Sequence, residues 1–224
     1  MKIITLIVLL SFYNKLAYSQ ITFGAQAMVN VANANYEAGA MTNKLSTSGK
    51  TKFGFGLLAE VNISRSFTLR PGLTYIGKGI IATFQHYGRT YDYIRDLDFN
   101  VIEFPVVFCY NAHFKSAKLF VGIGESLGFG IKGRERYTHT IANPGAAGTT
   151  VTDSYNAYAF APPEHNFGSF KSVEISATGI AGLQFNNGIF ADISYLKGLN
   201  NLSALHYSNR GFQLGMGYLF HYRK

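Results

Sequence analysis

Residues 52–63 read Lys-Phe-Gly-Phe-Gly-Leu-Leu-Ala-Glu-Val-Asn-Ile, with an apolar side chain at every second position. Phe53 and Phe55 fall on one face of this stretch, whereas Lys52 and Gly54 fall on the other. A period of two residues with one apolar face indicates a β-strand. The stretch therefore predicts a strand whose two faces meet different surroundings.

The same alternation recurs along the chain and predicts eight strands in all. They cover residues 21–33, 52–63, 66–78, 97–110, 118–132, 173–185, 188–197 and 212–222. The composition agrees with a β-protein, because 19 Phe, 15 Tyr and 24 Gly accompany only 5 Pro. It excludes collagen, coiled coil and ordinary disorder. The single cysteine excludes an intramolecular disulfide and a cysteine-based zinc cluster.

Two predicted strands break the alternation. In the fourth, the apolar residues first occupy odd-numbered positions, as at Leu97 and Phe99. From Ile102 onward they occupy even-numbered positions, so the apolar face changes side within the strand. We interpret its lower half as embedded in a membrane and its upper half as projecting beyond it, joined through a bulge. In the fifth, Glu125 falls on the apolar face, and a bulge near Gly124 would correct its direction.

The polar faces of the strands are predicted to line the inside of a barrel. They carry many glycines, which would weaken a solvent-exposed face and offer nothing to water. A narrow lumen, by contrast, needs small residues to make room for a few charged ones. An apolar exterior is the arrangement of a membrane barrel and the inverse of a soluble one. The alternative is a soluble, lipocalin-like carrier with its apolar faces inside.

The lengths of the seven connections support the membrane barrel. If the first strand runs outward from the periplasm, short turns follow the even strands and long surface loops follow the odd strands. Asn-Asn-Gly in the last short connection is a hairpin signal. The short connections are 63–66, 111–117 and 186–188, and the long ones are 34–51, 83–96, 133–171 and 198–209.

Aromatic residues are predicted to form a girdle at each membrane interface, where such side chains are favoured. Closing the strands into a ring also removes the sheet edges that lipid would not tolerate. We therefore predict an all-β fold, an eight-stranded antiparallel up-and-down transmembrane β-barrel. The expected girdle residues are Phe23, Phe67, Tyr110, Phe185 and Tyr222 at the periplasmic edge, and Phe53, Tyr75, Phe129, Tyr195 and Phe212 at the outer edge.

The first residues of the chain have the features of an export signal. Lys2 precedes the apolar run of residues 3–10, and Ala17-Tyr18-Ser19 supplies small residues at the two positions that a signal peptidase reads. We expect a cleaved signal peptide at 1–19 and a barrel domain at 20–224. The net charge of +8 comes from scattered basic residues. The expected partners are therefore outer-membrane lipid and lipopolysaccharide, and not nucleic acid.

Four stretches resemble the PorT-like outer-membrane β-barrel proteins of Bacteroidota. Residues 101–110 (VIEFPVVFCY) resemble the family's L-E-I-P-L-L-L-K-Y strand, and residues 66–79 (SFTLRPGLTYIGKG) its S-L-R-P-E-L-x-Y-x-x-K-G strand. Residues 120–130 (FVGIGESLGFG) and 192–202 (DISYLKGLNNL) resemble its Gly-rich fifth strand and its R-Y-x-Y-G-L-T-N-I stretch. The resemblance implies a Gram-negative outer-membrane location, insertion by the barrel-assembly machinery and, as in named members, an accessory part in type IX protein secretion.

Five charged residues on the predicted polar faces are candidates for an interior ion-pair network: Glu60, Arg70, Glu103, Glu174 and Asp192. The interior of an eight-stranded barrel is just wide enough for side chains to fill it. Removing one partner there would leave a poorly solvated charge. We predict a structural plug, and the alternative is an ion path through a small pore.

The tetrapeptide His206-Tyr207-Ser208-Asn209 is the sharpest catalytic candidate. It resembles the His-Tyr-Ser-Asn stretch of PagL-type lipid A deacylases, in which His would activate Ser and Asn would help to hold the oxyanion. The acid of those enzymes follows the motif, but no Asp or Glu follows Ser208 here. The six histidines show no metal-ligand spacing either. We therefore predict no enzymatic activity, cofactor or metal, with lipid A deacylation as the alternative.

The longest predicted surface loop, 133–171, is rich in aromatic residues. Function on a rigid scaffold often lies in such loops. Tyr137, Tyr155, Tyr158, Phe160 and Phe167 are candidates for a recognition surface, and the alternative is a loop shaped mainly by its environment. The sequence thus predicts a barrel that presents surface loops for structural or interaction roles.

Overall fold

The computed structural model describes residues 21–37, 42–86, 91–142, 150–160, 170–203 and 206–220, which leaves the expected signal peptide outside the described residues. No helix in these ranges is long and apolar enough to cross a lipid bilayer. The strands are β1 (Ile21–Asn35), β2 (Thr42–Asn62), β3 (Phe67–His86), β4 (Tyr91–His113), β5 (Ala117–Ala142), β6 (Thr150–Tyr158), β7 (Val173–Phe185), β8 (Ile189–Gly198) and β9 (Ser208–Phe220).

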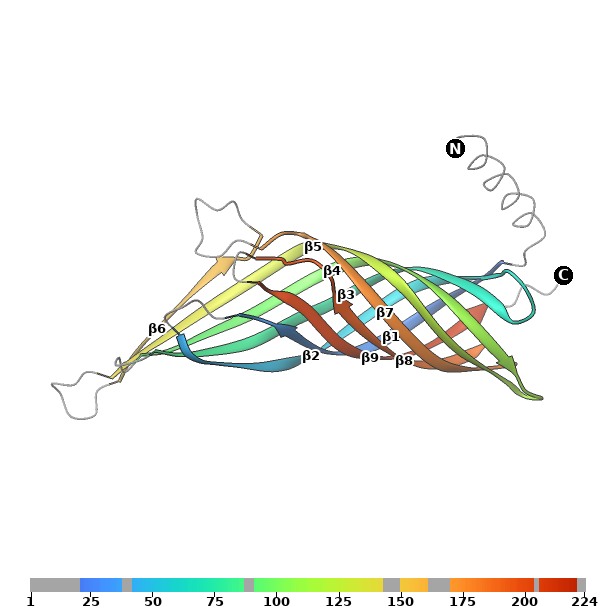
Figure 1. Ribbon diagram of the computed structural model, residues 1–224, viewed down its shortest axis with the longest axis horizontal. Helices are drawn as coiled ribbons and strands as arrows, with labels where there is room; N and C mark the ends of the chain where they lie inside the picture. Colours follow the sequence, from blue (N-terminus) through green and yellow to red (C-terminus); the bar gives the residue numbers. More distant parts are fainter. Residues whose placement is uncertain are drawn as a thin grey trace, which may run out of the picture.

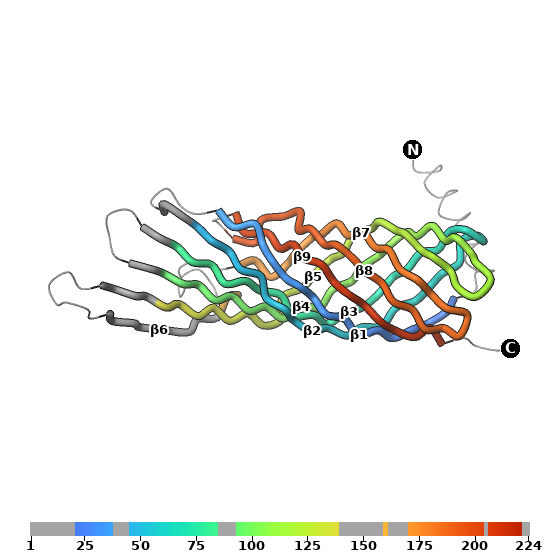
Figure 2. Tube along the Cα trace, turned by 90° about the horizontal axis from the view of Figure 1, so that it is seen from below, coloured from blue at the N-terminus to red at the C-terminus, as the bar shows by residue number. Residues whose placement is uncertain are grey.

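Eight of these strands form a closed antiparallel ring (Figures 1 and 2). Neighbours follow the order β1, β2, β3, β4, β5, β7, β8, β9, and β9 pairs with β1 to close the ring. β6 pairs with the far end of β5 and extends the rim. The predicted eight-stranded up-and-down barrel is confirmed.

The strands are staggered around the ring. Followed from Lys118 through each paired neighbour in turn, the ring returns to β5 at Gly128, ten residues farther along. Such a stagger tilts every strand relative to the barrel axis. A row of paired residues therefore climbs from β5 through β7 to β8, toward the end of the barrel where β5 ends.

The part of the barrel near the start of β1 is apolar outside and polar inside, as predicted. Phe53 and Met216 are 75% and 65% exposed, whereas Glu60 and Arg70 are buried. We call the outward-facing apolar residues of this part the apolar band. Its members include Phe55, Leu57, Leu73, Phe104, Val106, Phe108, Val121, Ile123, Leu127, Leu183, Ile193, Leu214 and Met216.

Aromatic side chains stand at both edges of the apolar band. Near the three short turns they are Phe23, Phe67, Tyr110 and Phe185, and at the opposite edge Phe53, Phe129, Tyr195 and Phe212, all of them exposed. Tyr75 is half-buried at that edge, where it stacks on Phe55. Tyr222 lies outside the described residues. The short connections are also where they were predicted, and Gly188 in the last of them has φ of 92°, a left-handed conformation that suits glycine.

Four strands, β2 to β5, continue well beyond the apolar band (Figures 1 and 2). We call this part the projection; it comprises residues 42–50, 80–86, 91–100, 132–142 and 150–158. The predicted loops 34–51 and 83–96 are therefore wrong over most of their length. β2 already begins at Thr42, and β3 runs to His86 before β4 starts at Tyr91.

The upper half of the fourth strand was predicted to project, but the rest of the projection was assigned to loops, because its inside and outside are exchanged relative to the band. In β4 the odd residues face inward throughout, so Leu97, Phe99 and Cys109 are all buried, while Phe104 and Phe108 are exposed. The prediction that the upper half of this strand projects beyond the apolar band is confirmed, but the change of parity does not come from a bulge in β4. It marks the level at which the outer face passes from an apolar environment to water, so that the apolar residues turn inside.

A bulge does occur, but on the neighbouring strand. β4 pairs Asn100 with Lys132 and then Val101 with Gly130, which leaves one extra residue on β5. Around Gly124 the pairing of β5 with β4 and β7 runs without a shift. The bulge predicted there is wrong, and Glu125 points outward from the apolar band.

The inside of the upper barrel is an aromatic core. Phe170 lies 5.1 Å from Tyr207 and 5.2 Å from Phe99 between ring centroids. Phe170 and Tyr207 come from predicted surface loops, whose ends fold back into the barrel. The backbone N–H of Phe170 donates to the carbonyl of Ala159, at 2.8 Å. The other buried members of the core are Met28, Ala34, Tyr36, Ile76, Ile80, Ala82, Phe84, Leu97, Val101, Ala159 and Leu202.

Candidate functional site

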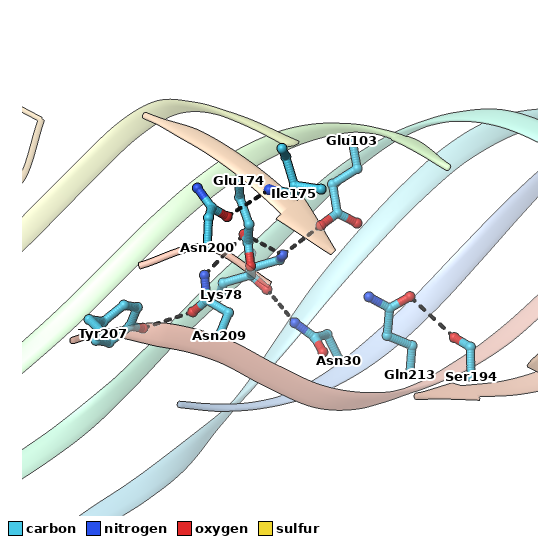
Figure 3. A network of polar contacts seen from close by, with 11 residues as sticks. Asn30, Lys78, Glu103, Glu174, Ile175, Ser194, Asn200, Tyr207, Asn209 and Gln213 are labelled. Carbon is cyan, nitrogen blue, oxygen red and sulfur yellow. Dashed lines mark hydrogen bonds and ion pairs between the residues drawn. The ribbon is translucent and has the colours of Figure 1, made fainter. Parts of the chain in front are cut away.

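Directly beneath the aromatic core, a buried lysine is held between two glutamates (Figure 3). Lys78 Nζ lies 2.6 Å from Glu103 Oε1 and 2.8 Å from Glu174 Oε2, and all three side chains are at most 5% exposed. Lys78 extends from β3, Glu103 from β4 and Glu174 from β7. Three strands of the ring therefore converge on one ion-paired group, which we call the upper triad.

Two polar residues connect the upper triad to the core. Asn209 Nδ2 donates to Glu174 Oε2 at 3.1 Å, and Tyr207 Oη donates to Asn209 Oδ1 at 2.8 Å (Figure 3). Close by, Asn30 Nδ2 donates to the Gly77 carbonyl at 2.8 Å. Tyr207, Asn209 and the upper triad thus form one connected set of hydrogen bonds and ion pairs inside the lumen.

A second ion cluster lies lower in the lumen. Lys118 Nζ is 2.5 Å from Glu60 Oε1, and Arg70 Nε is 3.8 Å from Glu60 Oε2. The Arg70 guanidinium also lies over two aromatic rings, 4.2 Å from the centroid of Phe120 and 5.0 Å from that of Phe190. These cation–π contacts hold the guanidinium in place where little water can reach it.

Between the two clusters is a small cavity of about 70 Å³, lined by both polar and apolar residues. Its lining includes Arg70, Ser126 and Asp192. Each of these has a buried polar atom without a hydrogen-bond partner, namely Arg70 Nη1, Ser126 Oγ and Asp192 Oδ2. A cavity of this size has room for a few ordered water molecules, which would satisfy such groups.

The five charged residues predicted for the lumen all lie there, but they do not form one network. Glu103 and Glu174 belong to the upper triad, whereas Glu60 and Arg70 belong to the lower cluster, and Asp192 borders the cavity. The prediction omitted the lysines that bind the glutamates. Lys78 is on the predicted polar face of its strand, so alternation alone could have placed it. Lys118 directly follows a predicted turn, so the alternation did not show whether its side chain points into the lumen.

A third polar cluster, which was not predicted, lies inside the projection. Arg95 is paired with Glu135 and hydrogen-bonded to the hydroxyls of Tyr36 and Tyr137, the latter at 2.9 Å. Burial raises the pKa of Tyr36 to about 12, against the opposing attraction of the Arg95 guanidinium. Arg95 and Glu135 had been assigned to loops, so no alternation was sought around them.

The predicted recognition surface is not assembled by the described residues. Tyr137 is 3% exposed and points into the projection, so it is not available at the surface. Phe160 packs against the aromatic core. The backbones of Tyr155 and Tyr158 belong to β6, but their side chains lie outside the described residues, as does Phe167 altogether.

The outer wall of the projection carries ion pairs of its own. Lys50 and Lys52 on β2 reach across β3 to Asp96 and Asp98 on β4, with Lys50 Nζ 3.0 Å from Asp98 Oδ1. A Cβ at Gly77 would lie 2.9 Å from Cβ of Lys52, so this glycine makes room for the lysine stem. Surface pairs of this kind contribute little stability, but they show that this wall faces water.

The residues of the candidate catalytic tetrapeptide face two sides of the barrel. Tyr207 and Asn209 are buried inside, whereas His206 is exposed outside. The ring of His206 is engaged by Asn201, with Nδ1 2.8 Å from Asn201 Nδ2. Asn209 is occupied by Tyr207 and Glu174, so its amide is not beside Ser208. Ser208 lies on the outward side together with His206, whereas Tyr207 and Asn209 lie inside, so the four side chains are not gathered on one face.

Comparison with known protein families supports the assignment of an outer-membrane β-barrel. A family model described as the outer membrane protein beta-barrel domain matches residues 10–204. No curated protein sequence matches this chain.

Similar solved structures include Ail, the attachment invasion locus protein of Yersinia pestis, at 16% identity over 89% of this chain and 98% of that one, with a TM-score of 0.38. The outer membrane enzyme PagL is 14% identical over 87% and 98%, with a TM-score of 0.45. OprG from Pseudomonas aeruginosa is 10% identical over 90% and 95%, also with a TM-score of 0.45. With an apolar band outside, ion pairs inside and a family match over most of its length, the chain belongs to the outer membrane protein beta-barrel domain family.

Proposed function

We propose that this chain is an integral outer-membrane protein with a closed lumen, whose role is to hold the projection above the membrane for structural or interaction purposes. The observation that carries this proposal is the upper triad with the aromatic core on top of it. Together they fill the lumen at the level where the barrel leaves the apolar band, so that a solute would have to displace buried ion pairs in order to pass.

The construction of the projection supports an interaction role. Long surface loops would be free to move, whereas paired strands hold their outer side chains in a fixed array. Inside, the Arg95 cluster and the aromatic core join the strands to one another. The outer wall therefore offers a partner a rigid, charged surface that begins directly above the membrane.

A conductance measurement tests the closed lumen. We expect the purified protein to insert into planar bilayers without producing steady ion channels, because the lumen holds buried ion pairs and packed rings. Insertion is verified separately by the gel mobility of unboiled samples, so that electrical silence is not mistaken for failed insertion. Stable, stepwise openings by correctly folded protein would contradict the proposal and support the small-pore alternative.

An accessory part in type IX secretion is the specific form of the interaction role that the sequence resemblance suggests. It would be supported if deletion of the chain left lipid A unchanged and altered the set of exported proteins. In that case the projection and the short turns at the other end of the barrel would be the first surfaces on which to seek a partner.

A further inference from the structure

The apolar band contains one charged residue that the barrel itself does not explain. Among the described residues between the two aromatic girdles, Glu125 is the only outward-facing charged side chain, and it is exposed. Its neighbours along β5, Ile123 and Leu127, also point outward, at 74% and 40% exposure. A carboxylate on the lipid-facing side of a barrel wall is unfavourable to a degree that depends on its depth. It calls for a partner outside the chain.

The residues next to Glu125 are unusually small. β7 lies beside β5, and its outward positions in this region are Ala177, Gly179 and Ala181. A Cβ at Gly179 would meet nothing within 4 Å, so packing inside this chain does not require a glycine there. The missing side chains leave a shallow depression in the wall, in which another surface can approach the backbone closely.

A lysine stands on the far side of the same depression. Ala177 pairs with Glu125 on β5 and with Lys197 on β8, so the three form one row across the wall. Lys197 is exposed, and neither it nor Glu125 has an ion-pair or hydrogen-bond partner in the part of the chain that the structure describes. The wall thus places a negative and a positive side chain on opposite sides of a strip of small residues.

From this arrangement we propose that the wall formed by β5, β7 and β8 is the contact surface of a homodimer in the membrane. Two copies inserted in the same direction are related by a twofold axis along the membrane normal, and such an interface is self-complementary. With the axis at Ala177, Glu125 of each copy faces Lys197 of the other. Lys197 lies nearer the outer surface because the row climbs from β5 to β8, and a lysine stem is long enough to cover this offset.

Two features of the barrel fit this contact. The tilted strands of two barrels cross at an angle when they meet, so the closest approach is local and falls where small residues are placed. Each copy also contributes both charges, so the pairing occurs twice and leaves neither carboxylate exposed to lipid. The proposal does not depend on the role given to the projection or on the closure of the lumen.

Crosslinking in the membrane tests the contact. In outer membranes that contain Ala177→Cys, a short thiol-to-thiol crosslinker is expected to give a covalent dimer. The native Cys109 is buried in the lumen and cannot contribute. The matched control is Ala59→Cys, an outward-facing small residue of the band on β2, four strands away in the eight-stranded ring. Equal crosslinking from both positions, or none from Ala177→Cys, would overturn the proposal.

A charge exchange identifies the occupant as a second copy. In the Ala177→Cys background, Glu125→Lys alone and Lys197→Glu alone are each expected to abolish the crosslinked dimer, because like charges then face each other. The double exchange is expected to restore it. Failure of the double exchange to restore the dimer would overturn the proposal, and would instead fit a lipid or another protein as the partner of Glu125. The gel mobility of unboiled samples shows that every variant has folded.

Discussion

The variant Lys78→Met is expected to lose about 3–5 kcal/mol of unfolding free energy, because it leaves two buried carboxylates without their cation. Glu103 and Glu174 would then repel each other inside the lumen, where both side chains are at most 5% exposed. The loss is measured as a shift of the urea midpoint, followed by circular dichroism and by the mobility of unboiled samples. The chain has no tryptophan whose fluorescence could report on unfolding.

A charge-neutral version of the same site is the control. The variant with Lys78→Met, Glu103→Gln and Glu174→Gln together is expected to recover most of the lost stability, since replacing a whole buried ion group is often close to neutral. If Lys78→Met alone unfolded at the same urea concentration as the parent protein, the upper triad would not be a buried, ion-paired group.

The second large effect is expected at Tyr207, beside the outward-facing Ser208. Tyr207→Ala should cost about 3–5 kcal/mol, the range for removing a large buried ring. Tyr207 is fully buried, contacts the rings of Tyr36, Phe99 and Phe170, and donates a hydrogen bond to Asn209. Ser208→Ala should change stability by no more than about 0.5 kcal/mol, as is usual for a position with no such contacts.

The same pair of variants distinguishes a structural role of the tetrapeptide from a catalytic one. We expect lipid A from cells that express the parent chain to have the same mass as lipid A from cells that express Ser208→Ala. An acyl chain removed by the parent and retained with Ser208→Ala and with a His206 variant would contradict this account. That result would establish the deacylase alternative.

Sequence alternation alone predicted the lower barrel because its environment there is simple. Each strand from one girdle to the other has lipid on one side and a narrow lumen on the other. Phe53, Phe55 and Leu57 therefore point outward while Glu60 points inward, as the period of two residues requires. The turn at Gly188 could also be predicted from neighbouring residues alone, because Asn-Asn-Gly favours a tight hairpin in any fold.

Apart from the upper half of β4, the projection could not be predicted in this way, because a single rule for inside and outside was applied along the other strands. Above the band the outer face meets water, so Leu97 and Phe99 belong inside while Asp96 and Asp98 belong outside. When the apolar parity changes within a strand, the pattern indicates either a bulge or a change of environment. The pairing partners that decide between them, such as Asn100 with Lys132, lie far apart in the sequence.

The ion partners were missed for a related reason. Alternation shows that Lys78, Glu103 and Glu174 point into the lumen. Whether they contact one another depends on the stagger of the three strands that carry them, which alternation does not give. Arg95 and Glu135 could not be considered at all while their segments were regarded as loops. Glu125 is the opposite case. The alternation correctly placed Glu125 on the outward, apolar face. The bulge near Gly124, which was introduced to turn this charge inward, is wrong.

Labelling of introduced cysteines from outside the cell tests the central claim, namely that the band faces lipid and the projection faces water; the native Cys109 is buried in the lumen. Lys132→Cys, on the outer wall of the projection, is expected to react in intact cells with a polar, membrane-impermeant maleimide. Met216→Cys in the band is expected to stay unlabelled, and Lys115→Cys in a short turn to react only after the outer membrane has been permeabilised. Labelling of Met216→Cys as readily as Lys132→Cys, with the chain in the soluble fraction, would contradict the membrane barrel.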